Sequence, residues 1–388
     1  MIKKRIESID IIKGLVMVIM ALDHVRDYFH SSAYIFSPTD PEKTTLILFF
    51  TRFITHFCAP TFSFLAGISA YIVGKRKTKN ELSIYLIKRG IWLVFVELVI
   101  MNFGWFFDIH FRTIIFGVIW SLGISMIFLA GLVNLPRNYI LIFSLIVIAG
   151  HNLLDTIQFS GNIVWAMVHN FHVVKINESS MLAVGYPIIP WIAVMSLGYY
   201  FGDFYKKQDD VAKRKTTFNI IGFCSIGLFL ILRFANLYGD KIPYINHGSV
   251  SKNIISFLNP SKYPPSLLYL LMTLGVAFLL LANIEGRKYK IMSFFGTFGK
   301  VPLFYYILHA YVVHLLAIFI SRLAGFNYGN ILPALGPDFV PDYLKGYGYS
   351  LLVVYIVWIF VVLLIYPICL FYNRYKEAHK EKWWLSYL

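Results

Sequence analysis

The sequence predicts an all-α bundle of membrane-spanning helices. Of its 388 residues, 58% are hydrophobic and only 14% are charged, whereas about one quarter of a soluble globular chain is charged. The apolar residues form continuous runs rather than alternating with polar ones, which excludes a membrane β-barrel. At about 20 residues per span plus short loops, the length fits about ten helices. We therefore expect residues 1–388 to form one transmembrane domain without a separate soluble domain.

The apolar runs place these helices in order along the chain. They cover residues 8–29, 46–74, 84–107, 113–134, 138–156, 182–204, 216–237, 264–284, 294–324 and 348–373. The second and the ninth are longer than a bilayer requires. We expect both to be tilted or broken, the ninth at Pro302.

The loops between these helices alternate in charge, and this alternation predicts their orientation. Lys and Arg gather at 3–5, 75–89, 206–215, 287–290 and from 374 onward, whereas they are sparse at 30–45, 157–181, 238–263 and 325–347. Basic loops stay in the cytoplasm, so we expect both termini on that side. This arrangement also accounts for the net charge of +15, and nucleic acid is not an expected partner.

Ionisable and aromatic residues lie at membrane depth, and the predicted topology places most of them between the midplane and the outer face. They are Asp23, His24, Arg26 and Asp27, with His30 just beyond, on the first helix, Arg52 and His56 on the second, Glu97 on the third, Trp120 on the fourth and His309 on the ninth. Any one of them is equally well explained as a structural ion pair or a satisfied core histidine. Together they predict a polar chamber, because hydrocarbon does not compensate so many charges.

Two prolines, Pro264 and Pro265, open the eighth helix from outside, and Lys262, Tyr263 and Ser266 flank them. The prolines alone predict a rigid helix start. The alternative is that Lys262 and the free N–H groups of the helix end present positive potential to a ligand. The sequence contains no phosphate loop, no GxSxG or HExxH motif and no Cys/His metal spacing, so we expect no metal site. Histidine beside carboxylates and arginine fits acyl transfer as well as a proton relay.

Several segments resemble the bacterial branch of the heparan-alpha-glucosaminide N-acetyltransferase catalytic family. They include RIESIDIIKG at 5–14, MALDHVRDYF at 20–29, FTRFITHFCAP at 50–60, VIWSLG at 118–123, YPIIPW at 186–191, KYPPS at 262–266 and FGKVPLFYYILH at 298–309. The resemblance implies a multi-span acyltransferase of the bacterial plasma (inner) membrane. It would move an acyl group, expected to be acetyl, from cytosolic acyl-CoA to an amine or hydroxyl of a sugar or glycan near the outer face.

The resemblance and the chemistry of the side chains together suggest roles for the residues of the chamber. The catalytic histidine of the lysosomal member of the family follows shortly after the helix that matches residues 8–29, and His24 and His30 both lie near that register. We expect His24 to be the base or the acyl-accepting group, with His30 as the alternative. Asp23 and Glu97 complete the predicted catalytic set. The acceptor is expected to contact the remaining polar and aromatic residues: Arg26, Asp27, Arg52, His56, Trp120, Lys262, Tyr263, Ser266 and His309.

The phosphates of the CoA donor require cations at the cytoplasmic face. Lys13, Lys88, Arg89 and Lys300 lie there at helix ends, although anchoring by the positive-inside rule explains each of them as well. The competing function is a transporter or export component for a sugar-like solute that uses the same chamber. A deep inner cavity that meets an outer one at His24 would favour the enzyme, and inverted repeats would favour the transporter. Membrane lipid is an expected partner, and a homodimer stays an open alternative.

Overall fold

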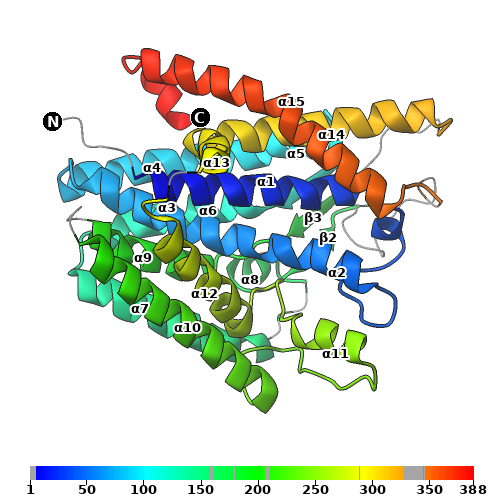
Figure 1. Cartoon of the computed structure of the whole chain (residues 1–388), viewed down its shortest axis with the longest axis horizontal. Coiled ribbons are helices and arrows are strands. Elements are labelled where there is room, and N and C mark those ends of the chain that lie inside the picture. Colours follow the sequence, from blue (N-terminus) through cyan, green and yellow to red (C-terminus); the bar gives the residue numbers. More distant parts are fainter. Residues whose placement is uncertain are drawn as a thin grey trace.

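The computed structural model describes residues 6–157, 159, 161–177, 180–205, 210–287, 289–326, 344 and 346–388. These residues are mostly helical, as predicted, with one small sheet (Figure 1). Six helical segments of the described part are long and apolar enough to cross a membrane: Leu46–Gly74, Arg137–Thr156, Val211–Ala235, Leu267–Ile284, Pro302–Leu323 and Leu351–Ala378. The count of about ten spans stays a prediction.

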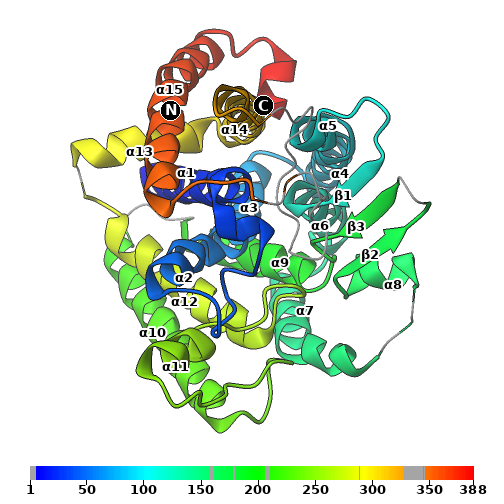
Figure 2. The ribbon, with the colours of Figure 1, turned by 90° about the vertical axis from the view of Figure 1, so that its right-hand side faces the viewer.

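Helix α1 (Glu7–Phe29) runs through the centre of the molecule. It packs against α3, α12, α13, α14 and α15, and both views show it between the group of α14 and α15 and the group of α3 and α12 (Figures 1 and 2). Three of its charged side chains, Asp10, Asp23 and Arg26, are buried. This central position means that the polar groups of α1 face other helices rather than the surroundings of the protein.

The second predicted helix is broken, as expected from its length. Helix α2 (Leu46–Phe53) continues through a 3-10 turn (Ile54–Phe57) into α3 (Cys58–Gly74). The third predicted helix begins with a capping box at Thr78 and Glu81 and forms α4 (Lys79–Phe95), a π-helical turn (Val96–Met101) and α5 (Asn102–Phe106). A π turn adds a residue to the helix and redirects the side chains that follow, and Glu97 lies in this turn.

Two predicted helices begin as strands, which corrects the sequence-based assignment. The run 113–134 contains β1 (Thr113–Phe116) before α6 (Val118–Leu132), and the run 182–204 contains β3 (Met181–Val184) before α9 (Trp191–Phe201). Strand β3 is the middle of a three-stranded sheet, parallel to β1 and antiparallel to β2 (His172–Lys175). Short apolar runs fit a helix and a buried strand equally well, which explains the error.

The ninth predicted helix is two helices, and the break lies at the expected proline. Helix α13 (Lys290–Lys300) ends at Val301, and Pro302 is the first residue of α14 (Pro302–Leu323). Figure 1 shows α13 nearly end-on, whereas Figure 2 shows it side-on and α14 end-on, so α13 lies across the direction of α14. A Cβ added to Gly14 of α1 would lie 1.7 Å from the carbonyl oxygen of Phe295. Glycine is therefore required where α1 and α13 cross.

The remaining helices complete the bundle and its loops. They are α7 (Arg137–Gly150), α8 (Ile163–Val168), α10 (Val211–Ala235), α11 (Val250–Phe257), α12 (Leu267–Ile284) and α15 (Leu351–Ala378), with short 3-10 turns at Ser31–Tyr34, His151–Thr156, Gly202–Tyr205 and Trp383–Tyr387. Helix α10 packs along α12. Of the three cysteines, Cys58 and Cys369 are buried, and Cys224 on α10 is exposed.

The described basic segments gather at one end of the bundle. Lys75, after α3, donates to the carbonyl of Tyr205 at 2.9 Å, and Lys300 lies 4.0 Å from Glu377 of α15. The start of α1 and the end of α15 lie at this end (left in Figure 1). Lys3, Lys4, Arg5, Lys206, Lys207, Lys288 and most of the predicted outer loop 325–347 lie outside the described residues.

Candidate active site

A cavity of about 610 Å³ lies between α1, the end of α2 with the turn that follows it, the sheet and the loop that precedes α12. Most of the predicted catalytic and acceptor-binding residues line it: Asp23, His24, Arg26, Asp27, Arg52, His56, Glu97, Lys262 and Tyr263. The other four predicted residues, His30, Trp120, Ser266 and His309, do not. We call this space the outer cavity. Its volume is within the range of ligand-binding pockets, about 300–1,000 Å³.

A network of ion pairs forms the charged wall of the outer cavity. Arg26 lies between two carboxylates of its own helix, 2.9 Å from Asp23 and 2.5 Å from Asp27. Arg52 reaches across from α2 to pair with Asp23. The two arginines and the two carboxylates compensate one another, which links α1 to α2. Loss of one member of a buried pair typically costs about 3–5 kcal/mol, because the other charge stays buried without a partner.

His24 contacts a second histidine rather than a carboxylate. Its Nδ1 atom lies 2.7 Å from Nε2 of His309 on α14, and the two rings stack with centroids 5.0 Å apart. The indole of Trp105 packs edge-on against the His24 ring at 4.8 Å. His24 is half-buried and lines the cavity, whereas His309 is fully buried. His309 therefore contacts the ring of His24 but does not line the outer cavity, although the sequence predicted that it would contact the acceptor there.

Glu97 caps a helix, whereas the described side-chain hydrogen bond of His24 is with His309. Its Oε2 atom accepts from the backbone N–H groups of Ile119 at 2.7 Å and Trp120 at 3.1 Å, at the start of α6. Gly117 leaves room for this carboxylate, because an added Cβ would lie 2.7 Å from Oε1 of Glu97. A carboxylate at a helix N-terminus is also favoured by the helix dipole. Trp120 contributes its backbone to this cap, and its indole packs edge-on against Phe116.

His30, the alternative catalytic histidine, ends α1 and begins the next turn. Its Nδ1 atom lies 2.6 Å from the hydroxyl of Ser32 and accepts from the backbone N–H of that residue at 3.2 Å. The side chain is buried and does not line the outer cavity. His56 does line the cavity, and its backbone carbonyl accepts from the hydroxyl of Tyr269 at 2.6 Å.

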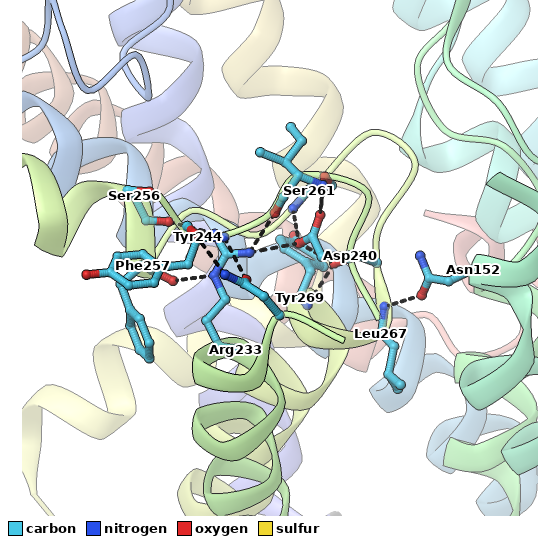
Figure 3. Close-up of polar contacts among 12 residues, drawn as sticks. Asn152, Arg233, Asp240, Tyr244, Ser256, Phe257, Ser261, Leu267 and Tyr269 are labelled. Carbon is cyan, nitrogen blue, oxygen red and sulfur yellow. Dashed lines mark hydrogen bonds and ion pairs between the residues drawn. The ribbon is translucent and has the colours of Figure 1, made fainter. Parts of the chain in front are cut away.

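A hydrogen-bond network holds the loop that carries Lys262 and Tyr263 (Figure 3). Asp240 accepts from the backbone N–H of Ser261 at 2.8 Å and from the hydroxyls of Ser261 and Ser266. Ser266 in turn accepts from the backbone N–H of Tyr269 and so caps α12. The predicted role of Ser266 in acceptor binding is therefore replaced by a structural one.

Arg233 fixes the neighbouring part of the same loop. Its guanidinium donates to the backbone carbonyls of Phe257 at 3.0 Å, Ile242 at 2.7 Å and Ser256 at 2.6 Å (Figure 3). Arg233 and Asp240 together hold both sides of the loop 238–266, while Lys262 and Tyr263 face the cavity. Among the described residues, no carboxylate forms an ion pair with Lys262. Its Nζ atom lies over the ring of Tyr263, 5.3 Å from the ring centre.

Two further cavities continue from the outer one toward the end of the bundle where the basic segments gather. A middle cavity of about 60 Å³ shares His24, Lys262 and Tyr186 with the outer cavity. An inner cavity of about 220 Å³ shares Met17, Phe62 and Leu122, among others, with the middle one. Tyr306 lines all three cavities. Tyr306 is not among the site residues predicted from the sequence, although its position three residues before His309 on the same helix indicates that the two side chains lie close together.

The predicted donor-binding cations separate into two pairs. Lys13 and Arg89 line the inner cavity, where Lys13 donates to the hydroxyl of Ser69 at 2.7 Å. Arg89 also contacts the end of the chain, because it donates to the carbonyl of Ser386. Lys88 is exposed, and neither Lys88 nor Lys300 lines the inner cavity. The structure thus brings two of the four predicted cations to one site.

One comparison with known proteins gives a match, and it covers most of this site. The model of the family described as "Heparan-alpha-glucosaminide N-acetyltransferase, catalytic" matches residues 5–231, more than half of the chain. The matched part contains Asp23, His24, Arg52 and Glu97 together with Lys13 and Arg89, and it ends before Lys262 and His309. A comparison with curated proteins finds no match.

Proposed function

The chain belongs to the heparan-alpha-glucosaminide N-acetyltransferase catalytic family, and we propose that it carries acetyl groups across a membrane. In this proposal the donor is acetyl-CoA on the cytoplasmic side. The acceptor is an amine or a hydroxyl of a sugar or glycan on the outer side. Family membership supports membrane acetyltransferase activity, and the donor, the acceptor and the sidedness are our proposal.

The observation that carries the proposal is the series of three cavities, in which the outer and middle cavities share His24 and Tyr306 lines all three. Two substrates that enter from opposite ends would meet at His24. The middle cavity, at about 60 Å³, is far below the size of pockets that hold drug-sized ligands. It suits a thin, flexible chain such as the pantetheine arm of CoA and does not suit a sugar ring. This difference favours the transferase over the competing function, a transporter for a sugar-like solute.

The inner cavity has the chemistry that a CoA donor requires. Lys13 and Arg89 are its charged residues, and apolar side chains such as Leu93 and Met126 form its walls. The cations would hold the phosphates, and the apolar walls would surround the pantetheine arm. Bound there, acetyl-CoA supplies an activated acetyl thioester. Lys88 and Lys300 are left with the anchoring role that the positive-inside rule gives them.

The outer cavity would bind the acceptor next to His24. Neutral imidazole can take a proton from an amine or hydroxyl near pH 7, or can attack the thioester itself. Lys262 lines both the outer and the middle cavity, so its charge would stabilise the negative oxygen that develops on the acetyl carbonyl. Arg52 and Arg26 are neutralised by Asp23 and Asp27 and would shape the site rather than supply this charge.

The charge pattern supports the proposed sidedness. The basic segments, the start of α1 and the end of α15 lie at one end of the bundle. The inner cavity is lined by Lys13 and Met17, which lie on α1 between that end and His24. The positive-inside rule assigns this end to the cytoplasm. We further propose the plasma membrane of a bacterium as the location, with surrounding lipid as a partner. A homodimer stays an alternative.

The test is acetyl transfer by the purified protein in detergent. Labelled acetyl-CoA is incubated with a panel of amino sugars and hydroxyl-bearing glycans, and labelled product is measured. We expect transfer by the wild type. Loss of a general base typically lowers the rate about 10²- to 10⁴-fold, and we expect this loss in His24→Ala but not in His30→Ala, with CoA binding unchanged in both. Sugar flux through vesicles without acetylation would instead support the transporter.

A further inference from the structure

Two hydrogen bonds connect the backbone of α14 to the ring of His24. The Nδ1 atom of His309 lies 3.1 Å from the carbonyl oxygen of Tyr305, one helical turn earlier. The Nε2 atom of His309 lies 2.7 Å from Nδ1 of His24. The ring of Tyr305 stacks on that of His309 with centroids 5.3 Å apart. Both nitrogen atoms of the fully buried His309 are therefore engaged, and packing fixes the ring.

The positions of the hydrogen atoms follow from these contacts. A carbonyl oxygen only accepts, so Nδ1 of His309 must carry a hydrogen. Among the described residues no carboxylate contacts His309, and a buried imidazolium without such a partner would be costly. His309 is therefore neutral, and its Nε2 is an acceptor. The hydrogen in the 2.7 Å contact must then belong to Nδ1 of His24.

We infer that His309 is a positioning residue, which holds His24 in the tautomer with its hydrogen on Nδ1 and its lone pair on Nε2. The Nε2 atom is on the edge of the ring turned away from His309, and His24 lines the outer and middle cavities. The opposite tautomer would present an N–H group, which cannot take a proton. This role rests on the proposed function, in which His24 is the reacting group.

The tautomer determines where each proton goes during transfer. The attacking oxygen or nitrogen of the acceptor forms its bond to the acetyl carbon, and its proton moves to Nε2 of His24. The carbon–sulfur bond then breaks, and the thiolate takes the proton from Nε2. If His24 instead attacks the acetyl carbon itself, the lone pair on Nε2 forms the new bond, the carbon–sulfur bond breaks and CoA leaves as the thiolate. The acceptor then attacks the same acetyl carbon, the bond from that carbon to Nε2 breaks, and the acceptor's proton goes to the CoA thiolate. In both cases Nδ1 keeps its hydrogen, and His309 stabilises the charged ring as an acceptor.

A matched pair of substitutions separates this role from simple packing. His309→Leu fills the space but offers no acceptor to Nδ1 of His24, whereas the side-chain oxygen of His309→Gln can accept from it. We expect His309→Leu to lower kcat about 10²- to 10⁴-fold with little change in KM for acetyl-CoA. His309→Gln should recover most of this loss. Equal activity of the two variants, at either level, would contradict the role of His309 as an acceptor.

A direct measurement does not depend on activity. Nitrogen-15 NMR of histidine-labelled protein in detergent, with the His24 signals identified by their loss in His24→Asn, reports which ring nitrogen carries hydrogen. We expect protonated Nδ1 and unprotonated Nε2 in the wild type and in His309→Gln, and a mixture of tautomers in His309→Leu. Hydrogen on Nε2 in the wild type would refute the inference. A wild type with the expected tautomer but without acetyl transfer would refute only the proposed function.

Discussion

Substitution of Glu97 separates a catalytic role from a structural one. The Oε2 atom of this carboxylate accepts from two backbone N–H groups at the start of α6. Glu97→Ala leaves both N–H groups buried without a partner, at about 1–3 kcal/mol each, so we expect a loss of about 2–6 kcal/mol in the free energy of unfolding. Glu97→Gln keeps an acceptor oxygen and loses mainly the interaction of the charge with the helix dipole, up to about 2 kcal/mol.

The assay is unfolding in mixed micelles with increasing SDS, followed by circular dichroism, together with the rate of acetyl transfer. We expect the loss of stability to be larger for Glu97→Ala than for Glu97→Gln, and kcat of Glu97→Gln to stay within a few-fold of the wild type. The catalytic role predicted from the sequence requires the opposite result. A stable Glu97→Gln protein that has lost transfer by about 10²-fold or more would restore that role and refute the capping argument.

Three further predictions test the packing, the donor site and the orientation. Gly14→Ala should prevent α1 and α13 from packing, because its Cβ would lie 1.7 Å from a backbone oxygen. The matched control is Gly131→Ala, where an added Cβ meets nothing within 4 Å. We expect Gly14→Ala to give a lower yield of monodisperse protein in size-exclusion chromatography than this control. Lys13→Met and Arg89→Met should each raise KM for acetyl-CoA about tenfold, because each loses a charged contact of about 1.5 kcal/mol. An unchanged KM in these variants would contradict the donor site, and so would an equal rise of KM in Lys88→Met. With the C-terminus in the cytoplasm, alkaline phosphatase fused after Leu388 should be inactive, and a fluorescent protein fused at the same place should be bright. An active phosphatase would place the C-terminus outside.

The sequence could predict which residues gather in the site but not the direction of each side chain. Charge alternation placed His24, Arg52 and Glu97 at one depth, and all three line the outer cavity. Depth alone does not reveal that His24 faces His309, because 285 residues separate them and the contact depends on the rotation of two helices. Ser266 is a helix cap, a role that its position beside two prolines could have indicated.

Strands β1 and β3 were not predicted from the sequence, because hydropathy does not distinguish them from the helices that follow. The residues of β1 and β3 are mostly apolar, with one residue between the end of β1 and the apolar helix that follows it, and six residues between the end of β3 and its apolar helix. Hydropathy therefore merges each strand with the helix that follows. Strand pairing joins residues far apart in the chain, such as Thr113 and Met181, and local patterns contain no information about it. The break at Pro302 was predictable because proline cannot continue the preceding helix.

Transfer across a sealed membrane tests the central claim most directly. The wild type is reconstituted into vesicles that contain the acceptor, labelled acetyl-CoA is added outside, and acetylated acceptor inside is measured after the external label is removed. Only protein molecules whose inner cavity opens to the outside of the vesicle can use this donor. We expect these molecules to form labelled product inside the vesicle, and we expect none with His24→Ala. Product that forms only when donor and acceptor are on the same side would contradict a path from the inner cavity through the middle cavity to His24.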